Sequence, residues 1–313
     1  TPTEGGLIID IGSNDATALK KYPQDIYELV GVDPTGTKFI EYYPDTIKLI
    51  PDFFSFDTLQ SRLGDKKAKV ITSFAMFYDL EDPVAFASDI EKTLDDDGVW
   101  VFEQSYLPSM IETNSFDTIC HEHLEFYALK QIMLIARKAG LKVLDVELND
   151  INGGSFSITA AKKDSNHAVN ERVIASMLEK EVSMGLDGTE VFTSFFERVE
   201  TQKHKFIKFL KDAKEEGKKV YGLGASTKGN VLLQHYGISE NLLPAIGDVN
   251  EDKFGKFTPG SLIPIISEAD VLMRNPDYLV ILPWHFRDFF LSNPKMAGRT
   301  LVFPLPELTI VEL

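Results

Sequence analysis

The sequence predicts an α/β protein with two mainly parallel sheets, each covered by helices on both faces. Two observations support this prediction. Short apolar runs alternate with helical patterns along most of the chain. A strand that ends in a glycine turn and leads into a helix occurs near the start, at 6–15, and again at 218–230. We therefore expect a first domain over 1–165, a helical connection over 166–217 and a second domain over 218–313.

Length and composition agree with two domains. The 313 residues are 43% hydrophobic, which suffices for two cores. The net charge of -16 argues against nucleic acid and anionic membranes as partners, because both demand a basic surface. The single cysteine, Cys120, excludes an intrachain disulfide and a multi-cysteine zinc site and suits a reducing compartment, so we expect the cytoplasm. No apolar run reaches transmembrane length.

The first two strands predict a nucleotide-type ligand site. The strand at 6–11 ends in a turn whose only glycine is Gly12, and the strand at 27–33 ends in Asp33. In such sheets the glycine lets the backbone approach a ligand, and an acid about 20 residues on accepts hydrogen bonds from ribose hydroxyls. The turn lacks GxGxxG spacing, so S-adenosylmethionine fits better than a dinucleotide. The alternative is an ordinary strand with a capping aspartate.

The next strands complete this sheet. A third strand is expected over 69–77, a fourth over 99–103, and two antiparallel strands over 142–147 and 155–161. Ligands lie beyond the carboxyl ends of parallel strands. We therefore expect the cofactor to contact Asp10, Gly12, Ser13, Asn14, Asp33, Pro34, Phe54, Ser73, Ala75 and Met76.

Two histidines and an acid follow the fourth strand. His121, Glu122 and His123 provide groups for proton transfer, and a helical pattern begins soon after them at 128. Tyr78 and Asp79, at the end of the third strand, are expected near the same site, although Asp79 could instead cap the next helix. His-x-His can also bind a metal, but the sequence offers no obvious third ligand, so we expect none. His121 could equally be a capping or packing residue.

The second half repeats the strand–turn–helix pattern after the charged helical stretch, which we interpret as a solvated helix pair. Further strands are expected at 243–249, 278–285 and 300–303. The turn at 222–230 lacks the GKS/T order of a nucleoside triphosphatase. Its amides, hydroxyls and Lys228 suit a pyrophosphate or a sugar, and the alternative is a tight turn with a solvated lysine.

Four motifs together resemble a known family. They are 7–15, 116–123, 222–230, and 255–260 with 282–285 behind it, and they span nearly the whole chain. The chain resembles the S-adenosylmethionine-dependent sugar C-methyltransferases, which act on nucleotide-linked keto-deoxysugars. The resemblance implies a class I methyltransferase Rossmann-like domain, followed by a second Rossmann-like domain that helps to hold the nucleotide-sugar. Family members commonly begin with a cysteine-rich zinc domain that this sequence does not include. They often have Tyr where Cys120 stands and His near Asp79.

The resemblance also assigns roles to residues. His123, Glu122, His121, Tyr78 and Asp79 are expected at the catalytic centre. The expected substrate contacts are Tyr106, Asn152, Ser226, Thr227, Lys228, Asn230, Trp284 and His285.

Methylation of carbon requires an enolate, made by removing the proton next to a ketone. His123 is the expected base, with Glu122 in support. The enolate oxygen needs a donor or a positive field, which Tyr78, Tyr106, His121 or Lys228 could supply. An O- or N-methyltransferase, or a non-catalytic nucleotide-sugar-binding protein, remains the alternative.

Overall fold

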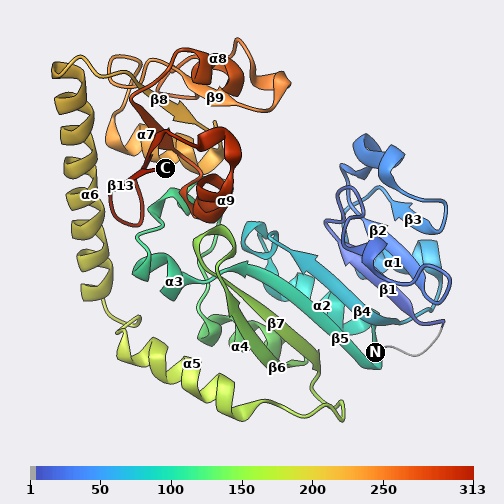
Figure 1. Ribbon diagram of the computed structural model, residues 1–313. Helices are drawn as coiled ribbons and strands as arrows, with labels where there is room; N and C mark the ends of the chain where they lie inside the picture. The colour runs from blue at the N-terminus through green and yellow to red at the C-terminus, as the bar shows by residue number, and fades with distance from the viewer. Residues whose placement is uncertain (1–4) are drawn as a thin grey trace. The chain divides into compact units, whose positions relative to one another are not determined.

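The computed structural model describes residues 5–313, which divide into two compact units (Figure 1). Unit 1 comprises the described residues up to Leu107 together with Leu124–Met184. Unit 2 comprises Pro108–His123 and Gly185–Leu313. These boundaries differ from the contiguous domains expected from the sequence. Residues 108–123 leave the first domain for the second, and the helical connection is divided between the units.

Unit 1 contains a seven-stranded sheet in the order β3-β2-β1-β4-β5-β7-β6, with β7 antiparallel to both of its neighbours. This is the strand order of class I methyltransferases, so the expected fold is confirmed. Its strands are β1 (Leu7–Ile11), β2 (Glu28–Val32), β3 (Ile47–Ile50), β4 (Ala68–Phe74), β5 (Leu94–Ser105), β6 (Leu141–Asn149) and β7 (Ser155–Lys162).

The central strands of unit 1 are apolar because both of their faces are buried. Ile8, Ile9 and Ile71 are fully buried. On β5, Trp100 stacks on Phe102 with ring centroids 3.9 Å apart. The helices of this unit are α1 (Phe56–Leu63), α2 (Pro83–Thr93), α4 (Leu129–Lys138) and α5 (Glu171–Ser183), with 3-10 turns η1 (Leu19–Lys21), η2 (Gly36–Tyr42), η3 (Phe77–Asp79) and η5 (Ile151–Gly153).

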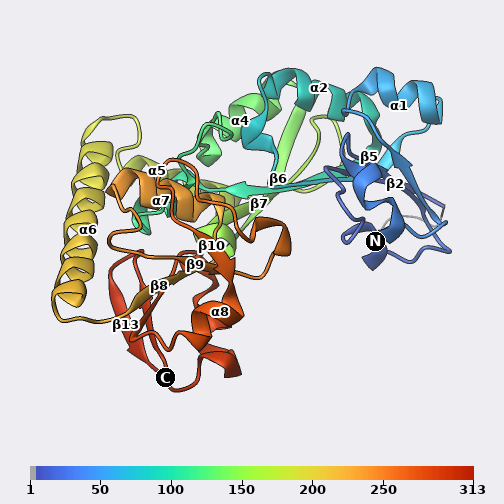
Figure 2. The same cartoon turned by 90° about the horizontal axis from the view of Figure 1, so that it is seen from above.

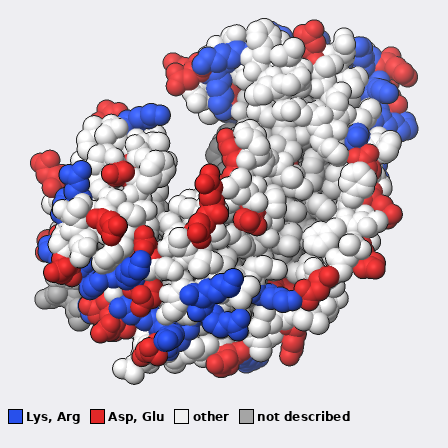
Figure 3. Space-filling model, turned by 180° about the vertical axis from the view of Figure 1, so that it is seen from behind, with Lys and Arg blue, Asp and Glu red and all other residues white. Residues whose placement is uncertain are grey.

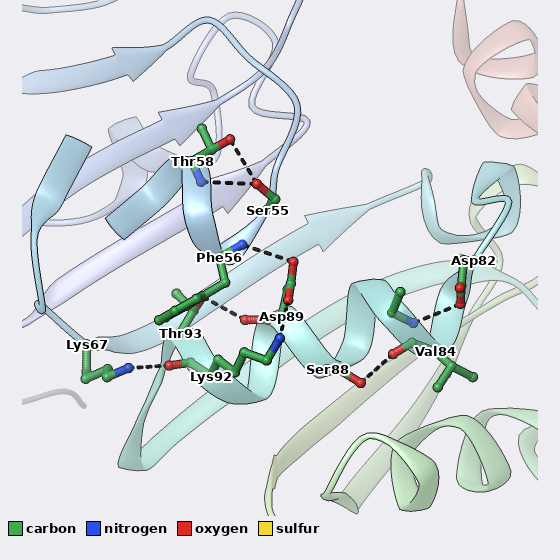
Figure 4. Close-up of polar contacts among 11 residues, drawn as sticks. Ser55, Phe56, Thr58, Lys67, Asp82, Val84, Ser88, Asp89, Lys92 and Thr93 are labelled. Atoms are coloured by element: carbon green, nitrogen blue, oxygen red, sulfur yellow. Dashed lines mark hydrogen bonds and ion pairs between the residues drawn. The ribbon is translucent and has the colours of Figure 1, made fainter. Parts of the chain in front are cut away.

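Side-chain caps fix where α1 and α2 begin (Figure 4). Ser55 accepts a hydrogen bond from the Thr58 amide, and Asp82 accepts one from the Ala85 amide. The Phe56 amide donates to Asp89 of α2 at 3.1 Å, which ties the two helices together. Because Asp82 caps α2, the alternative role of Asp79 as the cap is not realised.

Unit 2 contains a six-stranded sheet in the order β10-β9-β8-β11-β12-β13, parallel except for β13. Its strands are β8 (Val220–Leu223), β9 (Ile246–Asp248), β10 (Ile265–Ser267), β11 (Tyr278–Ile281), β12 (Thr300–Phe303) and β13 (Thr309–Glu312). The helices are α3 (Leu107–Glu112), α6 (Glu190–Glu215), α7 (Thr227–Tyr236), α8 (Glu268–Met273) and α9 (Arg287–Ser292), with 3-10 turns η4 (Phe116–Thr118), η6 (Glu251–Lys253), η7 (Trp284–Phe286) and η8 (Pro294–Met296).

The long helix α6 runs alongside this second sheet (Figure 2) and buries Val199, Phe206 and Leu210 in unit 2. Acidic and basic side chains are intermixed on the face shown in Figure 3. Within residues 5–313, no helix is both long and apolar enough to cross a membrane.

Candidate functional site

The first candidate site lies at the carboxyl ends of β1 and β2 in unit 1. Gly12 has φ 73°, a conformation that favours glycine, and its amide donates to the Val32 carbonyl at 2.8 Å. Asp33 accepts hydrogen bonds from the amides of Asn14 at 2.9 Å and Thr35 at 2.7 Å. Asp33 therefore shapes the turn, and a carboxylate has further lone pairs for ribose hydroxyls.

A second acid lies beside Asp33. Asp10 is 3% exposed and accepts a hydrogen bond from the Thr72 hydroxyl at 2.5 Å. The pKa of Asp10 is raised to about 6: burial is the main cause, the Thr72 hydrogen bond partly opposes it, and the charge of Asp33 adds to it. Two adjacent carboxyls form a site that suits a cationic ligand, such as an ammonium or a sulfonium.

The other predicted cofactor residues of unit 1 differ in their surroundings. A Cβ added at Gly12 would meet Met76 Cγ at 3.9 Å, so the ends of β1 and β4 come together as expected. Ser73 is buried and accepts a hydrogen bond from the Trp100 indole, and Ser13 bonds with the Tyr43 hydroxyl. Phe54 packs against Phe86. Pro34 and Ala75 are exposed.

Tyr106 requires a correction. It was expected to contact substrate, but it is fully buried and its hydroxyl donates to Glu181 at 2.8 Å. Glu181 also accepts hydrogen bonds from the amides of Leu129 at 2.6 Å and Lys130 at 3.1 Å, at the start of α4. Tyr106 therefore belongs to a buried structural network of unit 1, and neither substrate nor an enolate can reach it there.

Tyr78, Asp79 and Asn152 also lie in unit 1. Tyr78 is buried, and its carbonyl accepts hydrogen bonds from the amides of Leu124 at 3.0 Å and Glu125 at 3.1 Å. These two residues directly follow residues 116–123, which we call the histidine segment. Asp79 is exposed. Asn152 has φ 56° in the short turn between β6 and β7 and is half-buried.

The second candidate site surrounds residues 116–123 in unit 2. Phe116 packs against the ring of Tyr236 on α7, with centroids 5.3 Å apart. Asp117 is 1% exposed and accepts a hydrogen bond from the Trp284 indole at 2.8 Å. This bond joins the histidine segment to the end of β11. It also corrects the expectation for Trp284, which is buried and anchors Asp117 instead of presenting its polar group to substrate.

Lys228 is the electrostatic centre of this site. Burial lowers the pKa of Lys228, while Asp117 and Cys120 raise it. Burial lowers the pKa of His123, a backbone hydrogen bond at Thr118 raises it, and the charge of Lys228 lowers it again. Burial and Lys228 also lower the pKa of His285 to about 4. Lys228 and His123, predicted from separate motifs, therefore lie within electrostatic reach of each other.

A cavity of about 600 Å³ adjoins these residues within unit 2. Cys120, His121 and Glu122 line one side, and Thr227 and Asn230 of α7 line another. On this wall His121 and Glu122 are exposed and Cys120 is half-buried, as is the neighbouring His123. Ser226 is not among the lining residues. Its hydroxyl accepts a hydrogen bond from the Gly229 amide at 3.1 Å, so it caps α7.

Sequence reasoning gave no role to Asp117 or Glu181, although both are buried acids with several neighbours. The only signal in the sequence is an acid inside a mostly apolar or helical stretch. Within residues 5–313, no group of three His, Cys, Asp or Glu side chains is arranged to hold a metal ion.

Comparisons with known proteins cover both units. Residues 2–146 match a methyltransferase domain family, and residues 150–306 match the C-methyltransferase C-terminal domain family. The chain is 30% identical over 315 residues to C-methyltransferase NovU of Streptomyces niveus, a match that covers 99% of this chain and 74% of the relative.

Solved structures resemble about half of the chain. The 1,6-didemethyltoxoflavin-N1-methyltransferase of Burkholderia thailandensis has a TM-score of 0.39 and 10% identity, over 51% of this chain and 72% of its own. The plantazolicin methyltransferase BpumL has a TM-score of 0.40 and 12% identity, over 50% of this chain and 76% of its own.

Proposed function

The chain belongs to the S-adenosylmethionine-dependent C-methyltransferases, and on this premise we propose that its substrate is a nucleotide-linked keto-sugar. One observation carries the proposal: Cys120, His121 and Glu122 share a cavity with Thr227 and Asn230 of the first turn of α7. A space of about 600 Å³, whose lining combines these polar side chains with apolar ones, is large enough for a sugar. It lies in the same unit as His123 and Lys228, which supply a base and a cation.

His123 is the proposed base that removes the proton next to the ketone. Its lowered pKa keeps the imidazole neutral near pH 7, and only the neutral ring can accept a proton. Glu122 precedes it in the chain and raises its pKa slightly, which partly opposes the effect of Lys228. The balance leaves a base that is both uncharged and competent at neutral pH.

Lys228 is the proposed stabiliser of the enolate oxygen. Of the four residues considered from the sequence, Tyr106 is excluded by its burial and by its bond to Glu181. The positive field of Lys228 acts on His123, and it also acts on the buried Asp117, where burial raises the pKa and Lys228 lowers it. A cation held in place before the reaction lowers the energy of the developing oxyanion without reorganising.

S-adenosylmethionine supplies the methyl group as an electrophile when it is bound. The acids Asp10 and Asp33 are the proposed partners of its charged and ribose groups, and the Gly12 turn lets the backbone approach it. Orientation of the nucleophilic carbon by the substrate cavity then provides most of the remaining rate enhancement.

Solvent deuterium exchange tests the base directly. With S-adenosylhomocysteine bound, the parent protein should exchange deuterium into the carbon next to the ketone of its substrate. His123→Asn should lose roughly 10²–10⁴-fold in this rate while both ligands still bind, because general base catalysis contributes about that much. His121→Asn is the matched control and should be much milder. Undiminished exchange by His123→Asn would assign the base to another residue, and a product methylated on oxygen would contradict the proposed substrate chemistry.

A further inference from the structure

A groove of unit 1 is bounded by α4, α5 and the start of β6 (Figure 1). Its volume is about 710 Å³, and we call it the α4–α5 groove. Leu141 and Ile174 in its lining are buried, Met133 and Leu178 are half-buried, and Leu134 is 42% exposed. The groove therefore presents contiguous apolar surface to solvent, which is typical of a protein contact.

The α4–α5 groove is already formed in the single chain. Lys142 Nζ donates a hydrogen bond to the Ser165 carbonyl at 2.7 Å, and the Asn170 amide donates one to the Leu144 carbonyl at 2.7 Å. These bonds hold the segment between β7 and α5 against β6. A partner that docks there does not have to order the groove first, and an apolar groove beside two helices suits an amphipathic third helix.

The charge of the groove is opposite to the net charge of the chain, which is -16. One acid, Glu171, lines the groove together with the four cations Lys130, Arg137, Lys142 and Lys163. Lys130, Leu134 and Arg137 are spaced i, i+4 and i+7, so they follow one face of α4. A symmetric contact between two such faces is unfavourable, because it would bring the same cations together. The partner surface must instead be apolar and acidic.

The start of α6 in unit 2 has these properties. Phe192 and Phe196 are 39% and 58% exposed and lie one turn apart on the same face of the helix. Glu190 and Glu197 are exposed and, being seven residues apart, lie along one flank of that face. The cation of this stretch, Arg198, donates to the Ile111 carbonyl at 2.6 Å within unit 2. The exposed face of α6 is therefore aromatic and acidic.

We propose that the α4–α5 groove of one copy of the chain binds the start of α6 from a second copy. Lys130 and Arg137 are separated by seven residues, as are Glu190 and Glu197, which corresponds to about 10 Å along each helix. Two helices lying side by side can therefore pair both acids with both cations. One copy supplies the groove and the other supplies the helix, so the contact is heterologous and association can continue beyond a dimer.

Sedimentation velocity of the full chain tests this contact. The parent should associate progressively as its concentration rises through the micromolar range. Leu134→Glu in the groove and Phe192→Glu on α6 should each remain monomeric, because each places a carboxylate in the apolar contact. Mixed in equal amounts, these two variants should form a dimer that does not grow further, since the mixture retains one intact groove and one intact helix. Phe192 lies outside the 600 Å³ cavity, so its replacement leaves the lining of the candidate substrate site unchanged.

Val182→Glu is the matched control, because Val182 is 75% exposed on α5 and lies outside the groove. It should associate as the parent does. Arg137→Glu retains the apolar lining and should weaken association about tenfold, since it sets like charges against each other. Circular dichroism confirms that each variant is folded.

Three results would overturn the contact: the parent stays monomeric, Leu134→Glu or Phe192→Glu associates as the parent does, or the two variants fail to complement each other. Loss of association in Leu134→Glu alone would show that a different surface occupies the groove. None of these results bears on deuterium exchange by His123, so failure of the contact and failure of the proposed reaction are distinguishable.

Discussion

Asp10 stands at the end of β1 as a buried carboxyl beside a second acid, and its raised pKa has a cost in stability. A group whose pKa is raised on folding contributes stability below its unfolded pKa, and this contribution is lost as pH rises through the folded value of about 6. At neutral pH the burial of the charged Asp10 carboxylate therefore reduces the stability of the fold, and a bound cation would offset this loss.

We expect Asp10→Asn to be more stable than the parent at pH 7.5, by at most about 3 kcal/mol, because the neutral amide avoids the burial of charge. The advantage should shrink towards pH 5, where the parent carboxyl is mostly protonated. Thermal unfolding at both pH values measures this difference. The same variant should bind S-adenosylhomocysteine more weakly. If the stability difference between Asp10→Asn and the parent were the same at pH 5 and pH 7.5, burial of the charged Asp10 carboxylate would not be its cause.

Lys228 affects the protonation of His123, and this gives a second prediction. The pH dependence of deuterium exchange should fall on the acid side with a midpoint below 6.5, since the His123 pKa is lowered. Lys228→Met should move that midpoint to higher pH, because protonated His123 no longer faces a cation. The other titratable groups around this pair are Asp117, Cys120, Glu122 and His285.

Exchange rates measured between pH 5 and pH 8 test this shift. Lys256→Met, which removes an exposed lysine of the same unit, is the control and should leave the midpoint unchanged. A lower rate with an unmoved midpoint would restrict Lys228 to binding the substrate or the enolate.

Among the elements, α4 depends on a cap supplied by another helix. Its N-terminal neighbour Ala128 has no side-chain acceptor, and Glu181 of α5 accepts the amides of Leu129 and Lys130 instead. Tyr106 completes the same network from the end of β5. One buried carboxylate therefore joins a strand and two helices of unit 1.

Glu181→Ala should reduce the free energy of unfolding by about 3 kcal/mol, because it leaves buried donors without an acceptor. Urea unfolding of the purified variant measures this loss. Glu179→Ala, on the exposed face of the same helix, should change stability by less than about 0.5 kcal/mol. Similar losses in the two variants would indicate a general effect of charge on α5 instead of a specific cap.

The sequence predicted the buried central strands well, because strands covered on both faces are continuous apolar runs. β1, β4 and β11 coincide with such runs. It missed β3, β10 and β13, which are strands of three or four residues at the sheet edges and are only partly buried, so that none forms a long apolar run.

The sequence was sufficient to identify the motifs of the site, but it did not show which of their residues contact one another. Lys228 and His123 were both identified, but their proximity depends on tertiary packing. Tyr106 was misjudged because its partner Glu181 lies 75 residues away, and Trp284 because Asp117 lies 167 residues away. A sequence pattern reports the type of side chain and its local element, whereas burial and partner choice are set by the assembled fold.

For the molecule as a whole, the two proposed ligands are assigned to different units, which predicts separable effects. Asp33→Ala should weaken S-adenosylhomocysteine at least about tenfold, since it removes charge-assisted hydrogen bonds of about 1.5–3 kcal/mol each. Lys228→Ala should raise the Michaelis constant for the sugar substrate and leave cofactor affinity unchanged. Calorimetry and steady-state kinetics on both variants, after circular dichroism confirms folding, test this crossed pattern. Loss of cofactor binding in Lys228→Ala would reverse the assignment of the units.

The chain enters unit 2 at Pro108, returns to unit 1 at Leu124 and leaves it again after Met184. This path limits how related genes can recombine. A chimaera made by a single crossover near 184 would take Asp117 and His123 from one parent, and Trp284 and Lys228 from the other. The hydrogen bond between Trp284 and Asp117 would then have to form between residues from different parents, and so would the electrostatic interaction between Lys228 and His123. Exchange of substrate preference between homologues therefore requires a mosaic with at least three junctions, in which the sixteen residues Pro108–His123 travel with the C-terminal block.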